Sequence, residues 1–296
     1  MEAAIGQWRC LRILASSLVW AACSSAVAAG EERLSLRIDP RILLAQAIED
    51  GVPGAPLPVP AIAGMPSRTE VEFGGSHESL TNGLPDWSSV YLEAAHTFKE
   101  RHTLYGGLRE TRRFGLDDTE AYGGLYYPLA KTLTGVLEGS ASPTYNVLAK
   151  YSFGLQLLKS LPASWGIAGG IRHSEYSLAA ADVASLTLER YWSNFRGAYT
   201  LYSGRPEGSS SAAAHRFQLV YYYGDRDWAG ISYTTGREVE YVGPPRGTIT
   251  SEVRDWTLSG RHWFAPRWAI SYDLLTHEQG DLYRRRGGRV GIRHIF

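Results

Sequence analysis

The sequence predicts an all-β fold, a transmembrane antiparallel β-barrel of about 14 strands, within a range of roughly 12 to 16. Three observations predict it. Apolar and polar residues alternate along many segments of residues 69–296, and the connections between these segments are alternately short and long. Aromatic residues cluster beside the short connections.

The N-terminus predicts export. Arg9 and Arg12 precede a short apolar stretch, and Ala26-Val27-Ala28 has the small residues of a cleavage site. This pattern is typical of a secretory signal peptide, here residues 1–28, which is removed from the mature protein. Lipidation at Cys23 is the alternative, and the bulky Trp20 three residues earlier disfavours it.

The mature chain is close to neutral and free of cysteine. Thirty basic residues balance 30 acidic ones in the full sequence, and both cysteines, Cys10 and Cys23, lie in the predicted signal. A chain without a basic stripe is not expected to bind nucleic acid. Without cysteine it has no disulfide and no thiolate metal site. Beyond the signal no segment has the roughly 20 apolar residues of a transmembrane helix, so only a barrel could cross a membrane.

Residues 29–68 differ in composition from the remainder of the mature chain. Residues 40–49 predict two or three turns of amphipathic helix, and residues 51–66 are rich in proline and predict an extended linker. We expect residues 29–68 to form a periplasmic extension and residues 69–296 to form the outer-membrane barrel. A plug inside the barrel is the alternative for the extension.

Strict alternation identifies the strands. From Ala149 to Leu157 the odd positions are apolar and the even ones are polar or glycine, and Phe217–Tyr221 and Trp268–Leu274 repeat the pattern. Such a period of two places one polar and one apolar face on each strand. The predicted strands are 69–79, 87–99, 101–113, 118–128, 131–142, 147–158, 163–175, 183–192, 195–204, 213–224, 227–236, 251–264, 267–278 and 286–296.

The connections predict the orientation. Those after even-numbered strands are short, as at Asn194 and Pro266, whereas Leu80–Asp86, Pro206–Ser211 and Val239–Thr250 follow odd-numbered strands and are longer. Outer-membrane barrels have short periplasmic turns and longer external loops, so both ends of the barrel are expected in the periplasm. The aromatic residues beside the short turns predict an interfacial girdle; they are Phe98, Tyr127, Trp165, Trp192, Phe195, Tyr223, Trp228, Phe264 and Trp268.

Part of the chain resembles the YaiO family of outer-membrane β-barrel proteins. The resemblance rests on the segment 104–109, the Arg113–Asp118 loop, the turn Tyr126-Tyr127-Pro128-Leu129, the strand rhythm and the terminal Phe296, and it covers about residues 69–296. It implies a barrel in the outer membrane, offers no catalytic residues to carry over, and implies a connection to export of surface polysaccharide.

The polar faces of the strands are expected to line the lumen, because charged side chains on the lipid face are costly. The candidate lumen-lining residues are Arg109, Glu138, Lys150, Arg172, Glu189, Arg196, Arg216, Arg261, Asp273 and Arg293, and the same register turns Glu72, Glu93, Glu120 and Arg289 inward. They form either a charged pore lining that selects solutes or a structural ladder that fills a narrow lumen.

A conduit for small solutes or exported surface polysaccharide is the leading functional hypothesis, and a structural or docking barrel without transport is the alternative. A lipid hydrolase is the third, because His173 stands beside Ser174 and near Ser177 at the level of the outer leaflet. A His beside a Ser is usually incidental, since nucleophilic catalysis also needs an orienting third group. We predict no enzyme activity, no catalytic, metal or cofactor-binding residue, and no cofactor.

The expected partners depend on the predicted location. They are outer-membrane lipid and lipopolysaccharide around the wall, the barrel-assembly machinery at Phe296, and polysaccharide if the conduit exports it. An aromatic residue is commoner at the position of His294, which is a mild departure from the usual terminal signal.

Overall fold

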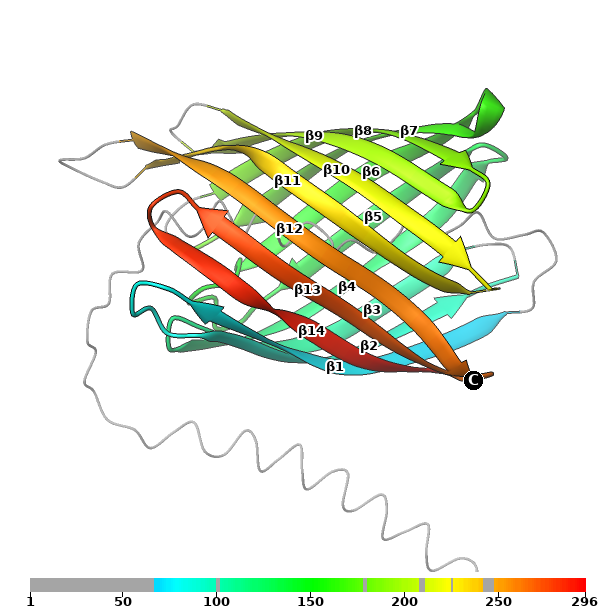
Figure 1. The fold of residues 1–296 in the computed structure, drawn as a ribbon, viewed down its shortest axis with the longest axis horizontal. Helices are drawn as coiled ribbons and strands as arrows, with labels where there is room; N and C mark the ends of the chain where they lie inside the picture. The colour runs from blue at the N-terminus through cyan, green and yellow to red at the C-terminus, as the bar shows by residue number, and fades with distance from the viewer. Residues whose placement is uncertain (1–66, 100–101, 178–179, 208–210, 225, 242–247) are drawn as a thin grey trace, which may run out of the picture. The chain divides into compact units, whose positions relative to one another are not determined.

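The computed structural model describes residues 67–99, 102–177, 180–207, 211–224, 226–241 and 248–296 (Figure 1). The predicted signal peptide and nearly all of the predicted extension lie outside the described residues. The strands are β1 (Arg68–Leu80), β2 (Trp87–Thr97), β3 (Thr103–Arg113), β4 (Leu116–Ala130), β5 (Leu133–Ala141), β6 (Tyr151–Leu161), β7 (Trp165–Glu175), β8 (Ala180–Trp192), β9 (Phe195–Pro206), β10 (Ala212–Tyr223), β11 (Asp227–Tyr241), β12 (Thr248–Ala265), β13 (Trp268–Gln279) and β14 (Tyr283–Ile295).

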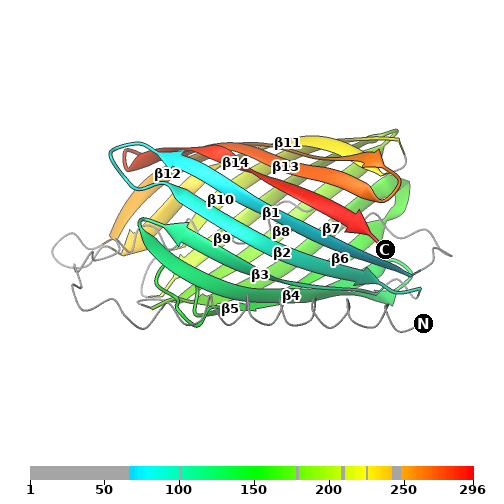
Figure 2. The same ribbon diagram turned by 90° about the horizontal axis from the view of Figure 1, so that it is seen from below.

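The strands form one closed antiparallel barrel. Each strand pairs with its neighbours in sequence, and β1 closes the ring against β14 from Glu70↔Ile295 to Leu80↔Arg285. Figures 1 and 2 show the strands tilted around a common axis. Closure gives every strand two hydrogen-bonded neighbours, which satisfies the backbone in a medium without water. The predicted fold class and the predicted count of fourteen strands are confirmed.

Alternation along each strand separates an outer from an inner face. On β1 the outward Phe73 is 59 % exposed, whereas the adjacent inward Glu72 is 4 % exposed. The same contrast separates Leu155 from Gly154 and Leu219 from Val220. The outer face is therefore apolar and the inner face polar, which is the reverse of a soluble barrel with an apolar core.

Most strand boundaries lie within three residues of the prediction, and the start of β6 and the end of β11 differ by more. Strand β6 begins at Tyr151 rather than at residue 147, because Asp118 binds the backbone of residues 146–148. Strands β11 and β12 extend to Tyr241 and from Thr248, so part of the segment predicted as a loop over Val239–Thr250 is strand. The backbone ladder continues past Arg237, an exposed charged residue that interrupts the apolar outer face by which the sequence marks this strand.

The connections confirm part of the predicted asymmetry. The turns β4–β5, β8–β9 and β12–β13 have two residues each, and the 3₁₀ turn Pro162–Ser164 joins β6 to β7. On the opposite rim, however, the β3–β4 connection is only Phe114-Gly115, and both residues have positive φ. That conformation is the two-residue hairpin turn for which glycine is favoured.

The predicted aromatic girdle is largely present. Phe98, Tyr127, Trp165, Trp192, Phe264 and Trp268 are exposed beside the short turns. Trp228 is an exception: it pairs with the inward Arg261 and lies on the lumen face. No helix in the described part of the chain is long and apolar enough to cross a membrane.

Candidate functional site in the barrel lumen

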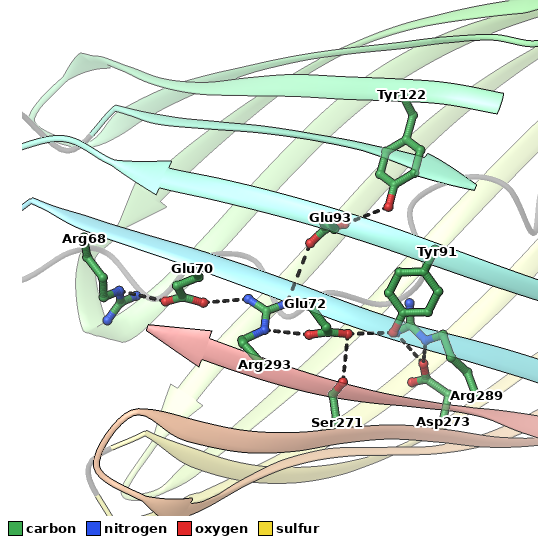
Figure 3. Close-up of polar contacts among 10 residues, drawn as sticks. All are labelled: Arg68, Glu70, Glu72, Tyr91, Glu93, Tyr122, Ser271, Asp273, Arg289 and Arg293. Atoms are coloured by element: carbon green, nitrogen blue, oxygen red, sulfur yellow. Dashed lines mark hydrogen bonds and ion pairs between the residues drawn. The ribbon is translucent and has the colours of Figure 1, made fainter. Parts of the chain in front are cut away.

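The strongest concentration of charge in the lumen surrounds Arg293 on β14 (Figure 3). Its Nε lies 2.6 Å from Glu72 Oε2, its Nη1 lies 2.6 Å from Glu70 Oε2, and its Nη2 lies 3.7 Å from Glu93. Glu70 also pairs with Arg68 at 2.7 Å. One guanidinium thus holds three carboxylates from β1 and β2, which the closure of β1 against β14 brings together.

Neighbouring residues complete this cluster. Glu72 Oε1 accepts hydrogen bonds from the Tyr91 hydroxyl at 2.7 Å and the Ser271 hydroxyl at 2.8 Å. Beside it, Arg289 donates to Asp273 at 2.7 Å (Figure 3). Acceptors and donors are therefore matched, and each buried charge has the partner that its removal from water requires.

Two tyrosines extend the network along the wall, each across a glycine of the intervening strand. Tyr105 on β3 passes over Gly124 on β4 and donates to Glu138 on β5 at 2.5 Å, where Arg172 also binds at 2.8 Å. A Cβ atom at Gly124 would lie 2.6 Å from the Tyr105 hydroxyl oxygen, closer than real Cβ atoms come. A glycine at this position therefore lets the ring lie close against the wall.

Tyr122 repeats the arrangement in the opposite direction. It reaches from β4 across Gly107 on β3 and donates to Glu93 on β2 at 3.2 Å. A Cβ atom at Gly107 would lie 2.7 Å from the ring of Tyr122. The two tyrosines interlock β2 to β5 through side chains as well as through the backbone ladder.

Further ion pairs line the remaining wall. They are Arg109–Glu120 at 2.6 Å, Arg196–Glu189 at 2.7 Å and Arg285–Glu78 at 2.6 Å. Each joins adjacent strands, and the Tyr105 and Tyr122 contacts join strands that are next but one. The side chains of these pairs therefore run along the wall, and none of these contacts crosses the barrel from one side to the other.

Arg216 and Arg261 differ from the paired arginines. Arg216 has a long 3.4 Å contact to the Ser232 hydroxyl, and the Nε atoms of both arginines are buried without a hydrogen-bond partner. They lie on β10 and β12, on either side of β11, where the inward residues Gly230 and Ser232 are small. These two guanidinium groups are therefore less completely hydrogen-bonded than those of the paired arginines.

Nine of the ten candidate residues lie on strands and face inward, and the structure brings several residues that were predicted to face inward into ion pairs, although the sequence did not predict which would meet. Glu138 meets Arg172, Glu189 meets Arg196, and Asp273 meets Arg289, which the same register also turned inward. Lys150 is the exception, because it is exposed and precedes β6, with its Nζ 5.7 Å from the ring centre of Tyr145. Whether these residues select solutes stays a prediction.

A segment at the opposite end of the lumen from the termini was not predicted. The carboxylate of Asp118 accepts hydrogen bonds from the backbone N–H groups of Val147 at 2.6 Å, Leu148 at 2.8 Å and Asn146 at 2.9 Å. Val147 and Leu148 are each only 1 % exposed. Ala149 packs against inward residues of β8, which places the β5–β6 connection over the inner wall at this mouth.

The geometry around His173 bears on the hydrolase hypothesis. His173 faces outward, and its Nδ1 lies 2.8 Å from Asp182 and its Nε2 lies 3.9 Å from Glu175. Ser174 is 3 % exposed and lies on the lumen face, so the wall separates the two side chains. An imidazole with a carboxylate but no hydroxyl within reach has no nucleophile to activate among these residues.

The sequence contained weak signals for the residues that were missed. Tyr91, Tyr105 and Tyr122 share the inward parity of Arg109 and Glu120, but a tyrosine is equally compatible with the lipid interface. Asp118 also shares this parity, yet its partners are backbone groups 28 to 30 residues away, and side-chain patterns do not reveal such contacts.

Comparison with known families identifies the class of protein. The family model of the YaiO membrane beta barrel domain matches residues 68–240, which covers β1 to β10 and nearly all of β11. The chain therefore belongs to the YaiO family of membrane β-barrel proteins. Searching curated proteins finds no match to this sequence.

Solved structures share the barrel fold at low sequence identity. OprD of Pseudomonas aeruginosa is 6 % identical, with a TM-score of 0.46, covering 78 % of this chain and 95 % of its own. OmpF of Salmonella typhi is 9 % identical, with a TM-score of 0.45 and coverages of 78 % and 97 %. A bacterial polysaccharide outer membrane secretin is 10 % identical, with a TM-score of 0.49 and coverages of 77 % and 97 %.

Proposed function

We propose that this protein is an outer-membrane conduit for polar solutes, with both ends of the barrel in the periplasm. One observation carries the proposal. Most charged side chains of the lumen are paired along the wall, so their pairing neither bridges the barrel nor fills it with an apolar core. A barrel of fourteen strands is wide enough to enclose more than its own side chains.

The chemistry of the wall indicates the class of solute. Acidic and basic groups alternate around the lumen instead of forming rings of one sign, which disfavours strong selection for a cation or an anion. Tyrosine hydroxyls and carboxylates on β1 to β5 offer hydrogen bonds to hydroxyl-rich molecules. We therefore propose small polar solutes and glycans, including exported surface polysaccharide, as the cargo.

Planar-bilayer recording tests the proposal directly. The purified mature barrel should give stepwise increases in conductance with little preference between potassium and chloride, because the lining charges are mixed. Addition of a neutral oligosaccharide should block the current in a concentration-dependent way if glycans enter the lumen. A folded barrel that inserts without conductance would instead support the structural or docking role.

A further inference from the structure

One rim of the barrel carries an excess of positive charge. This short-turn rim comprises the turns that follow β2, β4, β6, β8, β10 and β12. Among the described residues, each of these turns has one exposed basic side chain in it or within three residues of it. The six side chains are Lys99, Lys131, Lys159, Arg190, Arg226 and Arg267.

Acidic residues do not balance these cations. In the described part of this rim Glu70, Glu189 and Asp227 are buried or half-buried, and the first two are already paired with arginines. Glu100 and Asp225, which are outside the described residues, are offset in part by Arg101. The charge that faces outward at this rim is therefore positive.

The opposite rim has a different arrangement. There the exposed arginines stand beside acids, as in Arg112–Asp117 at 2.7 Å and Arg284–Glu278 at 2.6 Å. Arg205 likewise pairs in register with the exposed Asp182. The excess of cations is thus a property of one rim and does not result from composition, since the whole chain is neutral.

Neighbouring turns position three of the cations. Lys159 Nζ donates to the Thr132 hydroxyl at 3.0 Å, and Arg226 donates to the carbonyl of Pro266 at 2.8 Å. The Arg190 guanidinium lies 5.2 Å from the ring centre of Trp165. Each contact joins one turn to the next, which holds the charge at the level of the rim.

The aromatic girdle indicates the level of the short-turn rim relative to the membrane. Phe98, Tyr127, Trp165, Trp192 and Trp268 are exposed on the same rim, and amphipathic rings of this kind lie among lipid headgroups. Basic side chains just beyond such a girdle lie at the level of the phosphate groups, toward which long basic side chains extend.

We propose that the short-turn rim is a binding surface for anionic phospholipid, whose phosphate groups the six cations engage. The distribution favours lipid over a protein partner. The cations occur at all six turns around the closed ring, and a leaflet surrounds a barrel on all sides, whereas a docked protein contacts one arc of it. The inference holds for an open or a closed lumen, so it does not depend on transport.

The test uses Lys99, Lys131 and Arg267, because no hydrogen bond or ion pair of these side chains occurs in the described part of the chain. The variant combines Lys99→Gln, Lys131→Gln and Arg267→Gln. Its matched control combines Arg205→Gln, Arg237→Gln and Arg286→Gln, which removes the same charge from exposed positions on the opposite rim. Each barrel is reconstituted in phosphatidylcholine containing brominated phosphatidylglycerol or brominated phosphatidylcholine, and tryptophan quenching gives the relative affinity for the two lipids.

The wild-type barrel should prefer phosphatidylglycerol, the control should retain that preference, and the variant should reduce it roughly fivefold or more. High salt should reduce the wild-type preference because it screens exposed charges. Equal preference in wild type and variant would overturn the proposal, as would a loss in the control as large as in the variant. If the triple variant does not fold, Lys99→Gln with Lys131→Gln gives the same comparison.

Discussion

At the scale of single residues, Arg293 is the centre of the lumen network. Replacing it by Gln leaves the carboxylates of Glu70, Glu72 and Glu93 near one another without their shared counter-charge. Arg293→Gln should lower the free energy of unfolding by about 1–3 kcal/mol, less than for a fully buried cluster because Glu93 is 28 % exposed. Urea titration of the folded barrel, followed by tryptophan fluorescence, measures this change.

The exposed pair Arg112–Asp117 provides the control for that measurement. Its side chains are 61 % and 52 % exposed, so Arg112→Gln should lower the free energy of unfolding much less than Arg293→Gln does. Equal effects of the two substitutions would show that burial of the Arg293 cluster does not matter for stability.

Asp118 supports a second prediction, because three backbone N–H groups of the β5–β6 connection depend on its carboxylate. Asp118→Ala leaves these donors unsatisfied, at a cost of about 1–3 kcal/mol, and should loosen the segment around Lys150. Trypsin should then cleave the folded barrel after Lys150 faster than it cleaves wild type. Asp117→Ala, one residue away and exposed, should leave the cleavage rate unchanged.

Arg293 and Asp118 also show what the sequence could not predict about single residues. The alternation of side chains between the two faces of a strand predicted that Glu138, Arg172 and Glu189 face inward. It could not predict which charges meet, because that depends on the register between strands far apart in sequence. Arg293 and Glu72 are 221 residues apart and meet only because the ring closes.

At the scale of the strand, the two faces of β10 should tolerate different substitutions. Leu219 faces lipid and is 43 % exposed, whereas Arg216 faces the lumen three residues away. Leu219→Arg places a charge on the lipid face and should cost about 2–4 kcal/mol if it lies near the midplane. Arg216→Ala should leave the barrel folded and shift the ion selectivity of its conductance toward cations. Heat-dependent gel mobility reports folding of both variants.

The reverse result would mean that the register of β10 has slipped by one residue, since such a slip moves every side chain to the opposite face. The sequence predicted this strand well because apolar and polar residues alternate without interruption from Phe217 to Tyr221. It predicted the end of β11 less well, because the exposed Arg237 interrupts the apolar face before the ladder ends at Tyr241.

At the scale of the whole molecule, closure of the sheet explains why a barrel whose strands contain no cysteine needs neither a disulfide nor a large apolar core. Every strand has two antiparallel neighbours, and the apolar surface is turned toward lipid. The regular spacing of apolar segments and turns predicted this architecture. The same regularity left the cargo undetermined, because many barrels with different solutes share the alternation that lipid imposes.

The orientation of the barrel gives the last prediction. We expect the rim with the short turns and both chain ends to face the periplasm, and the β9–β10 connection to lie outside. On intact cells, Ser211→Cys should react with a membrane-impermeant maleimide, whereas Asn194→Cys in the β8–β9 turn should react only after the outer membrane is permeabilised. Both positions are exposed. Cys10 and Cys23 lie in the segment that the predicted signal cleavage removes, so each variant should then have a single site for the label. Labelling of Asn194→Cys but not of Ser211→Cys on intact cells would reverse the proposed topology. The short-turn rim would then lie at the outer leaflet of the membrane instead of the periplasmic leaflet.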